Sequence, residues 1–357
     1  MSLKNKAALL AAVLCVQMAG GAFAAYAAED STGAIAESED IMIESGVDEV
    51  SGEDDEDEST DYTVSGDWSY SVTIDGTARI EGCSSGEEEI TVPDSLDGVA
   101  VTEIGANAFA GVTAKTISIP ASVEYISAEN PFVQAESLQQ ITVADQSEYY
   151  AAEGGVLYSK DKTVLVCYPQ AKVGNSFEIP EGVKELGTAA LYNTSLSGIT
   201  FPSTLTKIGR HAVSYCGRLG TADLSGTSVS IIDTMAFIED SELVEVLFPE
   251  NLYEIGLAAF YHCTSLKSVE LPPYLNIIGQ SAFEGTALTE ITVPSSVEQI
   301  GYSAFGYDEN GEALDSFMII GDEGSAAQTY ATDSDDEYGY ANNFAFMTTE
   351  QAETEAE

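Results

Sequence analysis

A short pattern recurs along most of this 357-residue sequence, and it constrains the fold more than any other feature. Each copy has an apolar-x-apolar-Pro segment, then an Ile-Gly pair, then an Ala-Phe pair. The clearest copies run over residues 243–260, 266–283 and 288–305. Self-similarity at a fixed period is the signature of stacked repeats that share one core.

The first apolar residue of each short segment marks the spacing of the repeat. These residues are Ile90, Ile117, Ile141, Phe177, Ile199, Ala222, Val246, Val269, Ile291 and Phe317. The steps between them are 27, 24, 36, 22, 23, 24, 23, 22 and 26 residues. Most of these steps fall in the range typical of leucine-rich repeats. The sequence therefore predicts a β-rich repeat solenoid of leucine-rich repeats, with short parallel strands, turns and short helical segments.

The composition of one copy explains why the copies must stack. Apolar-x-apolar alternation is typical of a short half-buried strand, and Pro ends it because Pro has no N–H to donate. The Ile-Gly pair allows a turn where a side chain would obstruct the next coil, and Ala-Phe brings a small and a large side chain into the core from the opposite wall. About six apolar side chains, worth roughly 2 kcal/mol each, cannot offset the entropy of ordering the whole coil. Only stacking completes the core and the backbone ladder.

These residues resemble a known family, the BspA-like (treponemal-type) leucine-rich repeat proteins of bacterial surfaces. The resemblance includes Val92-Pro93, the Ile104-Gly105 pair and Ala108-Phe109 near the start of the array. At the other end, residues 324–331 look like the short closing helix of such arrays. The resemblance covers roughly residues 64–347 and implies a secreted or surface-displayed binding protein. Members of the family are associated with adhesion to host matrix proteins, host cells or other bacteria.

The two ends of the chain differ from the repeat array. Residues 1–27 have basic residues, a short apolar run and small-x-small motifs, which indicate a secretory signal peptide. Residues 28–63 are predicted to be an acidic disordered linker, because residues 29–61 hold 15 acidic residues and no basic one. Residues 348–357 are predicted to be an acidic tail. The expected location is secreted or extracellular, with no transmembrane segment after cleavage of the signal peptide.

The solenoid is expected to occupy residues 64–347, with two irregular parts. The 36-residue step holds extra sequence, which predicts a hairpin insertion near residues 145–175 that turns near Asp161. A C-terminal capping segment is expected near residues 317–347. Two coils have Ala-Leu or Ala-Val in place of Ala-Phe, and residues 219–232 lack the strand-ending Pro.

Charge and composition exclude several function classes. The 60 acidic and 12 basic residues give a net charge of −48, which argues against nucleic acid as a partner. No phosphate-binding glycine loop and no nucleophile motif is present. The two histidines, His211 and His262, leave little room for a metal site or histidine catalysis. We therefore predict no enzymatic activity, no cofactor and no metal site, although an enzyme built on the repeat is a competing hypothesis.

The cysteines are expected to be structural thiols. Cys216 and Cys263 each follow the large core residue of a coil by three positions, two coils apart. Stacked coils would separate them by roughly 10 Å, which is too far for a disulfide. Cys83 and Cys167 lie far apart in the array, so no essential disulfide is expected.

The candidate binding residues form an exposed column on the first strand of each coil, between its two inward-facing apolar residues. The column consists of Thr91, Ser118, Thr142, Glu178, Thr200, Asp223, Leu247, Glu270 and Thr292. Solenoids commonly bind partners on such a continuous face. The alternative is that short polar residues simply suit an exposed sheet.

The predicted function is that of a secreted or cell-surface, non-catalytic binding protein, similar to an adhesin, with a protein or cell-surface macromolecule as its partner. The alternative is a structural or spacer protein of the bacterial cell envelope without a specific ligand. Residues 268–357 hold 18 acidic residues and no basic one, so this part is expected to attract basic partners at low salt. Solubility alone would also explain the charge.

Overall fold

The computed structural model describes residues 62–332 and 342–356. The chain divides into two units at Asp61, and the fold below is that of the unit Tyr62–Glu357. The predicted signal peptide and nearly all of the predicted linker lie outside the described residues. The first strand begins at Thr63, where the linker was expected to end.

An antiparallel sheet precedes the first repeats. The strands β1 (Thr63–Ser65), β2 (Trp68–Val72) and β3 (Ala78–Cys83) pair in sequence order. Strand β3 then pairs in parallel with β6 (Val99–Ile104), which also pairs with β5 (Ser95–Leu96) and β8 (Tyr125–Ile126). The meander therefore supplies the neighbour that the first coil would otherwise lack.

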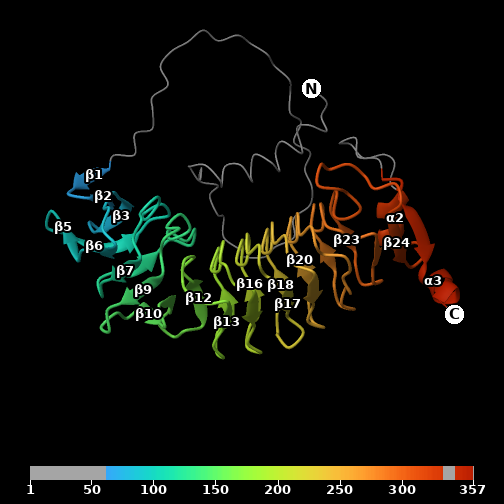
Figure 1. The fold of residues 1–357 in the computed structure, drawn as a ribbon, viewed down its shortest axis with the longest axis horizontal. Coiled ribbons are helices and arrows are strands. Elements are labelled where there is room, and N and C mark those ends of the chain that lie inside the picture. The colour runs from blue at the N-terminus through green and yellow to red at the C-terminus, as the bar shows by residue number, and fades with distance from the viewer. Residues whose placement is uncertain (1–61, 333–341, 357) are drawn as a thin grey trace, which may run out of the picture. The chain divides into compact units, whose positions relative to one another are not determined.

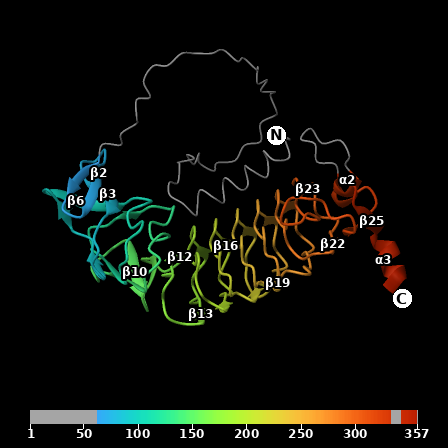
Figure 2. The ribbon, with the colours of Figure 1, turned by 45° about the horizontal axis from the view of Figure 1, so that its top comes forward.

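Two ladders of parallel strands run along the stack of coils (Figures 1 and 2). The first ladder contains the strands of the apolar-x-apolar segment. It is divided into the groups β4-β7-β9, β13-β15, β17-β19 and β22-β24-β25. Their bounds are Glu89–Thr91, Thr116–Ile119 and Gln140–Val143; Ser176–Glu178 and Gly198–Thr200; Thr221–Asp223 and Glu245–Leu247; and Glu290–Thr292, Met318–Gly321 and Ala345–Thr348.

The second ladder is one uninterrupted sheet in which nine strands follow in the order β10-β11-β12-β14-β16-β18-β20-β21-β23. From β14 onward it contains the strands of the Ile-Gly segment. The corresponding strands of the earlier coils, β6 and β8, belong to the sheet that precedes the first repeats. The bounds are Tyr150–Glu153, Val156–Ser159, Val164–Cys167, Glu185–Leu186, Lys207–Ile208, Ile231–Ile232, Glu254–Ile255, Ile277–Ile278 and Gln299–Ile300.

The Ala-Phe segments stack along a third edge, where backbone hydrogen bonds join turns instead of strands. Phe237 N–H donates to Ala259 O at 2.8 Å, and Phe260 N–H donates to Ala282 O at 2.8 Å. In most coils the residue before the Ala-Phe pair and the second residue after it have positive φ, as at Ala258 (52°) and His262 (56°). Non-glycine residues rarely adopt this conformation, and the repeated bonds between coils hold it in place.

The core side chains line up from coil to coil, which confirms the central prediction of a shared interior. Phe237, Phe260 and Phe283 stack with ring centroids 5.2 and 5.3 Å apart and interplanar angles of 9° and 5°. The second-ladder isoleucines Ile232 and Ile255 have no exposed surface. Burial of these side chains is the main favourable contribution to folding.

The glycine of the Ile-Gly pair is needed for close stacking. A Cβ on Gly279 would lie 2.5 Å from Gly256 C and 2.6 Å from Leu257 N. A Cβ on Gly301 would lie 2.4 Å from Gln280 N. Because these neighbours are backbone atoms of the preceding coil, a side chain at either glycine would push the coils apart.

The hairpin predicted near Asp161 is present. Strands β11 and β12 pair antiparallel on either side of residues 160–163. Strand β10 precedes them and also pairs with β11, so the insertion is a three-stranded meander. Its last strand, β12, pairs in parallel with β14. The insertion therefore supplies the second-ladder strand of its own coil.

The C-terminal segment closes the stack with helix α2 (Ala326–Thr332). Tyr330 is 7% exposed, and its hydroxyl donates to Phe305 O at 2.9 Å and accepts from Phe305 N–H at 3.3 Å. The hydroxyl thus replaces the backbone groups of a further coil on the third edge. The expected acidic tail contains helix α3 (Thr349–Ala356).

The predicted start of the last strand at Phe317 is wrong. Strand β24 begins at Met318, and Ile319 is the partner of Ile291. Phe317 is instead a core residue whose ring lies 6.0 Å from that of Phe305. The longer loop before this strand shifted the register by two residues.

Candidate binding surface

The parallel register brings successive residues of the predicted column next to one another. Thr91 pairs with Ser118, and Ser118 pairs with Thr142. Glu178 pairs with Thr200, and Asp223 pairs with Leu247. Thr292 pairs with Ile320. The strands therefore present these side chains in short rows, because alternate residues of a strand face the same side.

The column is neither fully exposed nor continuous. Ser118 and Thr142 are half-buried, and Thr142 Oγ1 donates to Ser118 Oγ at 2.9 Å. Leu247 places an apolar side chain, 40% exposed, in the row. Glu270 is exposed but lies outside any strand, because residues 268–272 do not join the ladder. The expectation of one unbroken ribbon is therefore wrong.

Each of these strands carries a second outward residue, which the sequence analysis missed. It lies two positions before the predicted one and is also mostly exposed. The pairs Glu89 with Thr116 and Thr221 with Glu245 are in register. The two-residue period of a strand was the signal that could have found them. The additional residues are Glu89, Thr116, Gln140, Ser176, Gly198, Thr221, Glu245 and Glu290. We call the two columns together the strand face.

The strand face combines hydroxyl and carboxylate groups. Its carboxylates are Glu89, Glu178, Asp223, Glu245, Glu270 and Glu290, and none of its residues is Lys, Arg or His. Hydroxyls can both donate and accept hydrogen bonds, whereas carboxylates only accept. The surface is thus suited to a partner that presents cationic and hydrogen-bonding groups.

The histidines are not arranged for catalysis. His211 is 3% exposed, and burial lowers its pKa to about 3, which keeps the ring neutral. Its Nδ1 lies 3.4 Å from Ser214 Oγ, but Ser214 is fully buried and out of reach of a substrate. His262 Nδ1 lies 3.1 Å from Glu239 Oε1. Burial opposes protonation of His262, but the hydrogen bond and charge of Glu239 outweigh it and raise the pKa.

The four cysteines among the described residues are free thiols. Cys216 and Cys263 are fully buried and donate to Leu191 O and Phe237 O at 3.2 and 3.1 Å. In the coil between them, Asp240 occupies the equivalent position, three residues after Phe237. This carboxyl has no exposed surface, accepts from Cys216 N–H at 2.7 Å through Oδ1, and has no partner at Oδ2. Burial raises the pKa of Asp240 well above its ordinary value.

The part of the chain that the structure describes contains no group of three or more His, Cys, Asp or Glu side chains that could hold a metal ion. Among the same residues, no helix has the length and apolar character needed to cross a bilayer.

The repeat matches a known sequence family. A sequence model of the BspA type leucine rich repeat region matches residues 75–153 and 167–262 in six copies. The chain is a BspA-type leucine-rich repeat protein. The matched ranges omit the interior of the hairpin meander, where the repeat pattern is interrupted.

Solved structures of bacterial leucine-rich repeat proteins are similar to this BspA-type chain. The pneumococcal vaccine antigen PcpA is 21% identical with a TM-score of 0.51, and the match covers 74% of this chain and 68% of PcpA. A leucine-rich repeat protein from Eubacterium ventriosum is 21% identical with a TM-score of 0.38 (64% and 95% covered). A leucine rich cell surface protein from Faecalibacterium prausnitzii is 19% identical with a TM-score of 0.32 (83% and 97% covered).

At these identities the likeness shows the fold alone. A search of curated proteins found no match to this chain.

Proposed function

We propose that this protein is a secreted or cell-surface, non-catalytic binding protein, similar to an adhesin, whose strand face binds a macromolecular partner. The observation that carries the proposal is the in-register alignment of outward hydroxyl and carboxylate side chains on neighbouring first-ladder strands. A row of this kind can contact an extended partner at several points at once.

Two further points support this role. The predicted signal peptide of residues 1–27, which lies outside the described residues, would direct the chain out of the cell. The solved structures of similar fold include a vaccine antigen and a cell surface protein. The acidic strand face favours a partner, protein or cell-surface macromolecule, that is locally basic.

Capture experiments with the full-length protein test the proposal. The immobilised protein is exposed to host matrix proteins and to bacterial cells, and bound material is measured against salt concentration. The triple variant Glu178→Lys, Thr200→Lys, Asp223→Lys reverses the charge of the central strand face. We expect it to lose at least tenfold in affinity for the captured partner, because each contact would become repulsive.

A matched control carries the same change in net charge away from the strand face. Thr206, Glu242 and Glu250 are exposed residues outside the first ladder. The variant Thr206→Lys, Glu242→Lys, Glu250→Lys should bind within twofold of the unmodified protein. Equal losses in both triple variants, or no saturable partner, would contradict the proposal and favour an envelope spacer without a ligand.

A further inference from the structure

Large apolar side chains are exposed on the outward side of the second ladder over three neighbouring coils. Tyr253 and Tyr274 are 49% and 61% exposed, Ile231 is 37% exposed, and Ile277 is half-buried. Tyr274 lies in the turn that leads into β21. A single exposed apolar residue needs no explanation, but a group of them indicates a site of interaction. This surface is separate from the strand face, which lies on the first ladder.

The strand pairing brings these residues together. Ile231 pairs with Glu254, and Glu254 pairs with Ile277, so the three outward side chains follow one another along the stack. Tyr253 precedes Glu254 and reaches the next coil, where its hydroxyl donates to Asn276 Oδ1 at 3.1 Å. We call the following residues the second-ladder patch: Ile231, Tyr253, Glu254, Tyr274 and Ile277.

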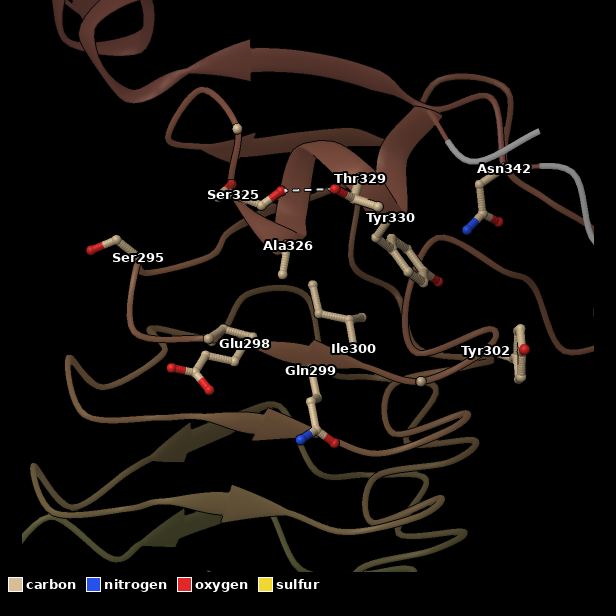
Figure 3. Close-up of a pocket in the computed structure, with 13 residues that line it drawn as sticks. Ser295, Glu298, Gln299, Ile300, Tyr302, Ser325, Ala326, Thr329, Tyr330 and Asn342 are labelled. Carbon is tan, nitrogen blue, oxygen red and sulfur yellow. Dashed lines mark hydrogen bonds between the residues drawn. The ribbon is translucent and has the colours of Figure 1, made fainter. Parts of the chain in front are cut away.

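Polar residues bound the patch at both ends of the row. Lys207 is the partner of Ile231 on the preceding coil, and its ammonium group is already paired with Glu185 at 3.2 Å. Gln299 is the partner of Ile277 on the following coil. Figure 3 shows the side chain of Gln299 extending away from helix α2. The apolar surface is therefore confined to the coils of β18, β20 and β21.

The charge of these coils indicates what kind of partner the patch fits. Residues 219–266 contain eight acidic residues and no Lys or Arg. Glu254, in the middle of the row, has no ion-pair partner among the described residues. An apolar surface with an unpaired carboxylate at its centre is complementary to a partner that is both apolar and basic. A neutral polysaccharide would use the tyrosine rings but not the carboxylate.

The spacing of the row matches a helix that lies along the stack. Strands of a sheet are about 4.8 Å apart, so Ile231 and Ile277 lie roughly 10 Å apart with Glu254 between them. A helix rises about 1.5 Å per residue, so side chains four and seven residues after a given one lie on the same face, roughly 6 and 10 Å along the axis. Same-side residues of an extended strand are about 7 Å apart and do not match the row.

We propose that the second-ladder patch binds an amphipathic basic helix of a partner protein, which lies along the stack across β18, β20 and β21. Two apolar residues of the helix, seven positions apart, pack on Ile231 and Ile277, and a Lys or Arg between them pairs with Glu254. Tyr253 and Tyr274 pack against the flank of the helix. The apolar face supplies the affinity, and the charge pair sets the register.

Fluorescence anisotropy of labelled peptides against the full-length protein tests the inference. The probe is an eighteen-residue helical peptide of Ala and Gln, with Leu at every seventh position and Lys four positions after each Leu. In one counterpart Glu replaces each Lys. In a positional isomer each Lys is two positions after its Leu, which places it on the opposite face of the helix. We expect both to bind at least tenfold more weakly than the basic probe, because neither brings a cation to Glu254.

Variants of the patch test where the probe binds. Glu254→Lys should weaken the basic probe at least tenfold and should strengthen binding of the Glu peptide. Glu242→Lys makes the same change in net charge at an exposed turn of the same coil and should alter affinity less than twofold. The double variant Tyr253→Ala, Tyr274→Ala should also lose at least tenfold. Tyr149→Ala, at a 43% exposed tyrosine outside the patch, should lose less than twofold.

Circular dichroism and the thermal midpoint confirm that the variants fold. Glu254→Lys should leave capture by the strand face unchanged, so this inference and the proposed function can fail separately. Absence of binding at millimolar basic probe, or equal affinity for the positional isomer, would overturn the inference. So would saturable binding of cellohexaose that is lost in the double tyrosine variant, without binding of the peptide, because the patch would then be a carbohydrate surface.

Discussion

The two ladders of this solenoid are built from the same coils but differ in continuity. The strands of the Ile-Gly segment are divided once, between β8 and the nine-stranded sheet. From β12 to β23 the second ladder pairs in parallel without a break, whereas the first is divided at the hairpin meander, after β15 and after β19. The difference follows from the space available to each strand. At Gly279 in the second ladder, an added Cβ would lie 2.5 Å from backbone of the previous coil, but at Gly198 in the first it would lie 3.9 Å from its nearest neighbour.

This contrast separates the structural part of each coil from the part that can vary. The Ile-Gly strand is fixed by the distance between coils, so an inward Ile or Leu recurs in its copies and Gly follows it in most of them. The first strand keeps its inward apolar residues but accepts hydroxyl, carboxylate or apolar residues on its outward side. The outward residues of the first ladder can therefore change without disturbing the stack.

The largest expected effect is a loss of stability when a glycine of the second ladder is replaced, compared with a glycine of the first ladder. Gly279→Ala should destabilise the protein by about 2–3 kcal/mol, because backbone of the neighbouring coil must move to make room. Gly198→Ala is the control and should be neutral or stabilising by roughly 0.5 kcal/mol, because the added methyl meets no obstacle and the unfolded chain loses freedom. Urea midpoints would measure both, and similar losses at the two positions would remove the proposed difference between the ladders.

The second effect concerns Asp240, which stacks between the two buried cysteine positions. Its pKa is raised by burial, so folding favours the protonated form. The contribution to stability is complete below the ordinary aspartate pKa of about 4 and is lost as pH rises through the raised folded value, at about 1.4 kcal/mol per pKa unit.

Asp240→Asn removes this dependence and keeps a side chain of similar size. The unfolding free energy of the variant, relative to the unmodified protein, should rise between pH 4 and pH 8. Denaturation at several pH values measures the difference, and the large net charge common to both proteins cancels. A difference that stays constant with pH would show that Asp240 titrates normally in the fold.

Substitutions on the strand face are expected to change the unfolding free energy by a smaller amount. Single substitutions such as Thr91→Ala or Thr200→Ala should alter the unfolding free energy by less than about 0.5 kcal/mol, because both side chains are exposed. The same substitution at the half-buried Thr142 removes its hydrogen bond to Ser118 and should cost about 1 kcal/mol. Equal values at Thr91 and Thr142 would indicate that this bond contributes nothing.

The smallest effect concerns the thiols. Reducing agent should leave the thermal midpoint unchanged, because all four described cysteines are free. Under native conditions a thiol reagent should modify the half-buried Cys83 before the buried Cys216 and Cys263. Rapid labelling of Cys263 would imply that the stack opens locally near its coil.

The repeat allowed most of the fold to be predicted from the sequence. The Phe stack, the first strand of most coils and the turn near Asp161 follow from the period and from the residues that end each strand. The strands of the second ladder were not predicted, because the Ile-Gly pair was interpreted as the site of a turn. The register at Phe317 could not be predicted, because the loop before it is longer than in other coils and both Phe317 and Ile319 are apolar. The missing first-ladder strand at residues 268–272 could not be predicted either, since Val269 and Leu271 have the alternation of a strand.

Two features of the third edge also could not be predicted from the sequence. Residues such as Ala258 and His262 adopt positive φ only because neighbouring coils bind their backbone, and neither residue type signals that conformation. The role of Tyr330 as a substitute for a missing coil depends on where α2 docks. The candidate column was predicted in position, but its second row was overlooked and its continuity was overestimated.

Hydrogen–deuterium exchange of the full-length protein, resolved by segment, tests the distinction between the two ladders most directly. Amides of the second ladder from Leu186 to Ile278 should exchange slowest and at similar rates, because each lies between two paired strands. Amides near the breaks of the first ladder, around Phe201 and Leu271, should exchange markedly faster. Equal protection along both ladders, or faster exchange in the second, would contradict a continuous scaffold that supports a variable binding face.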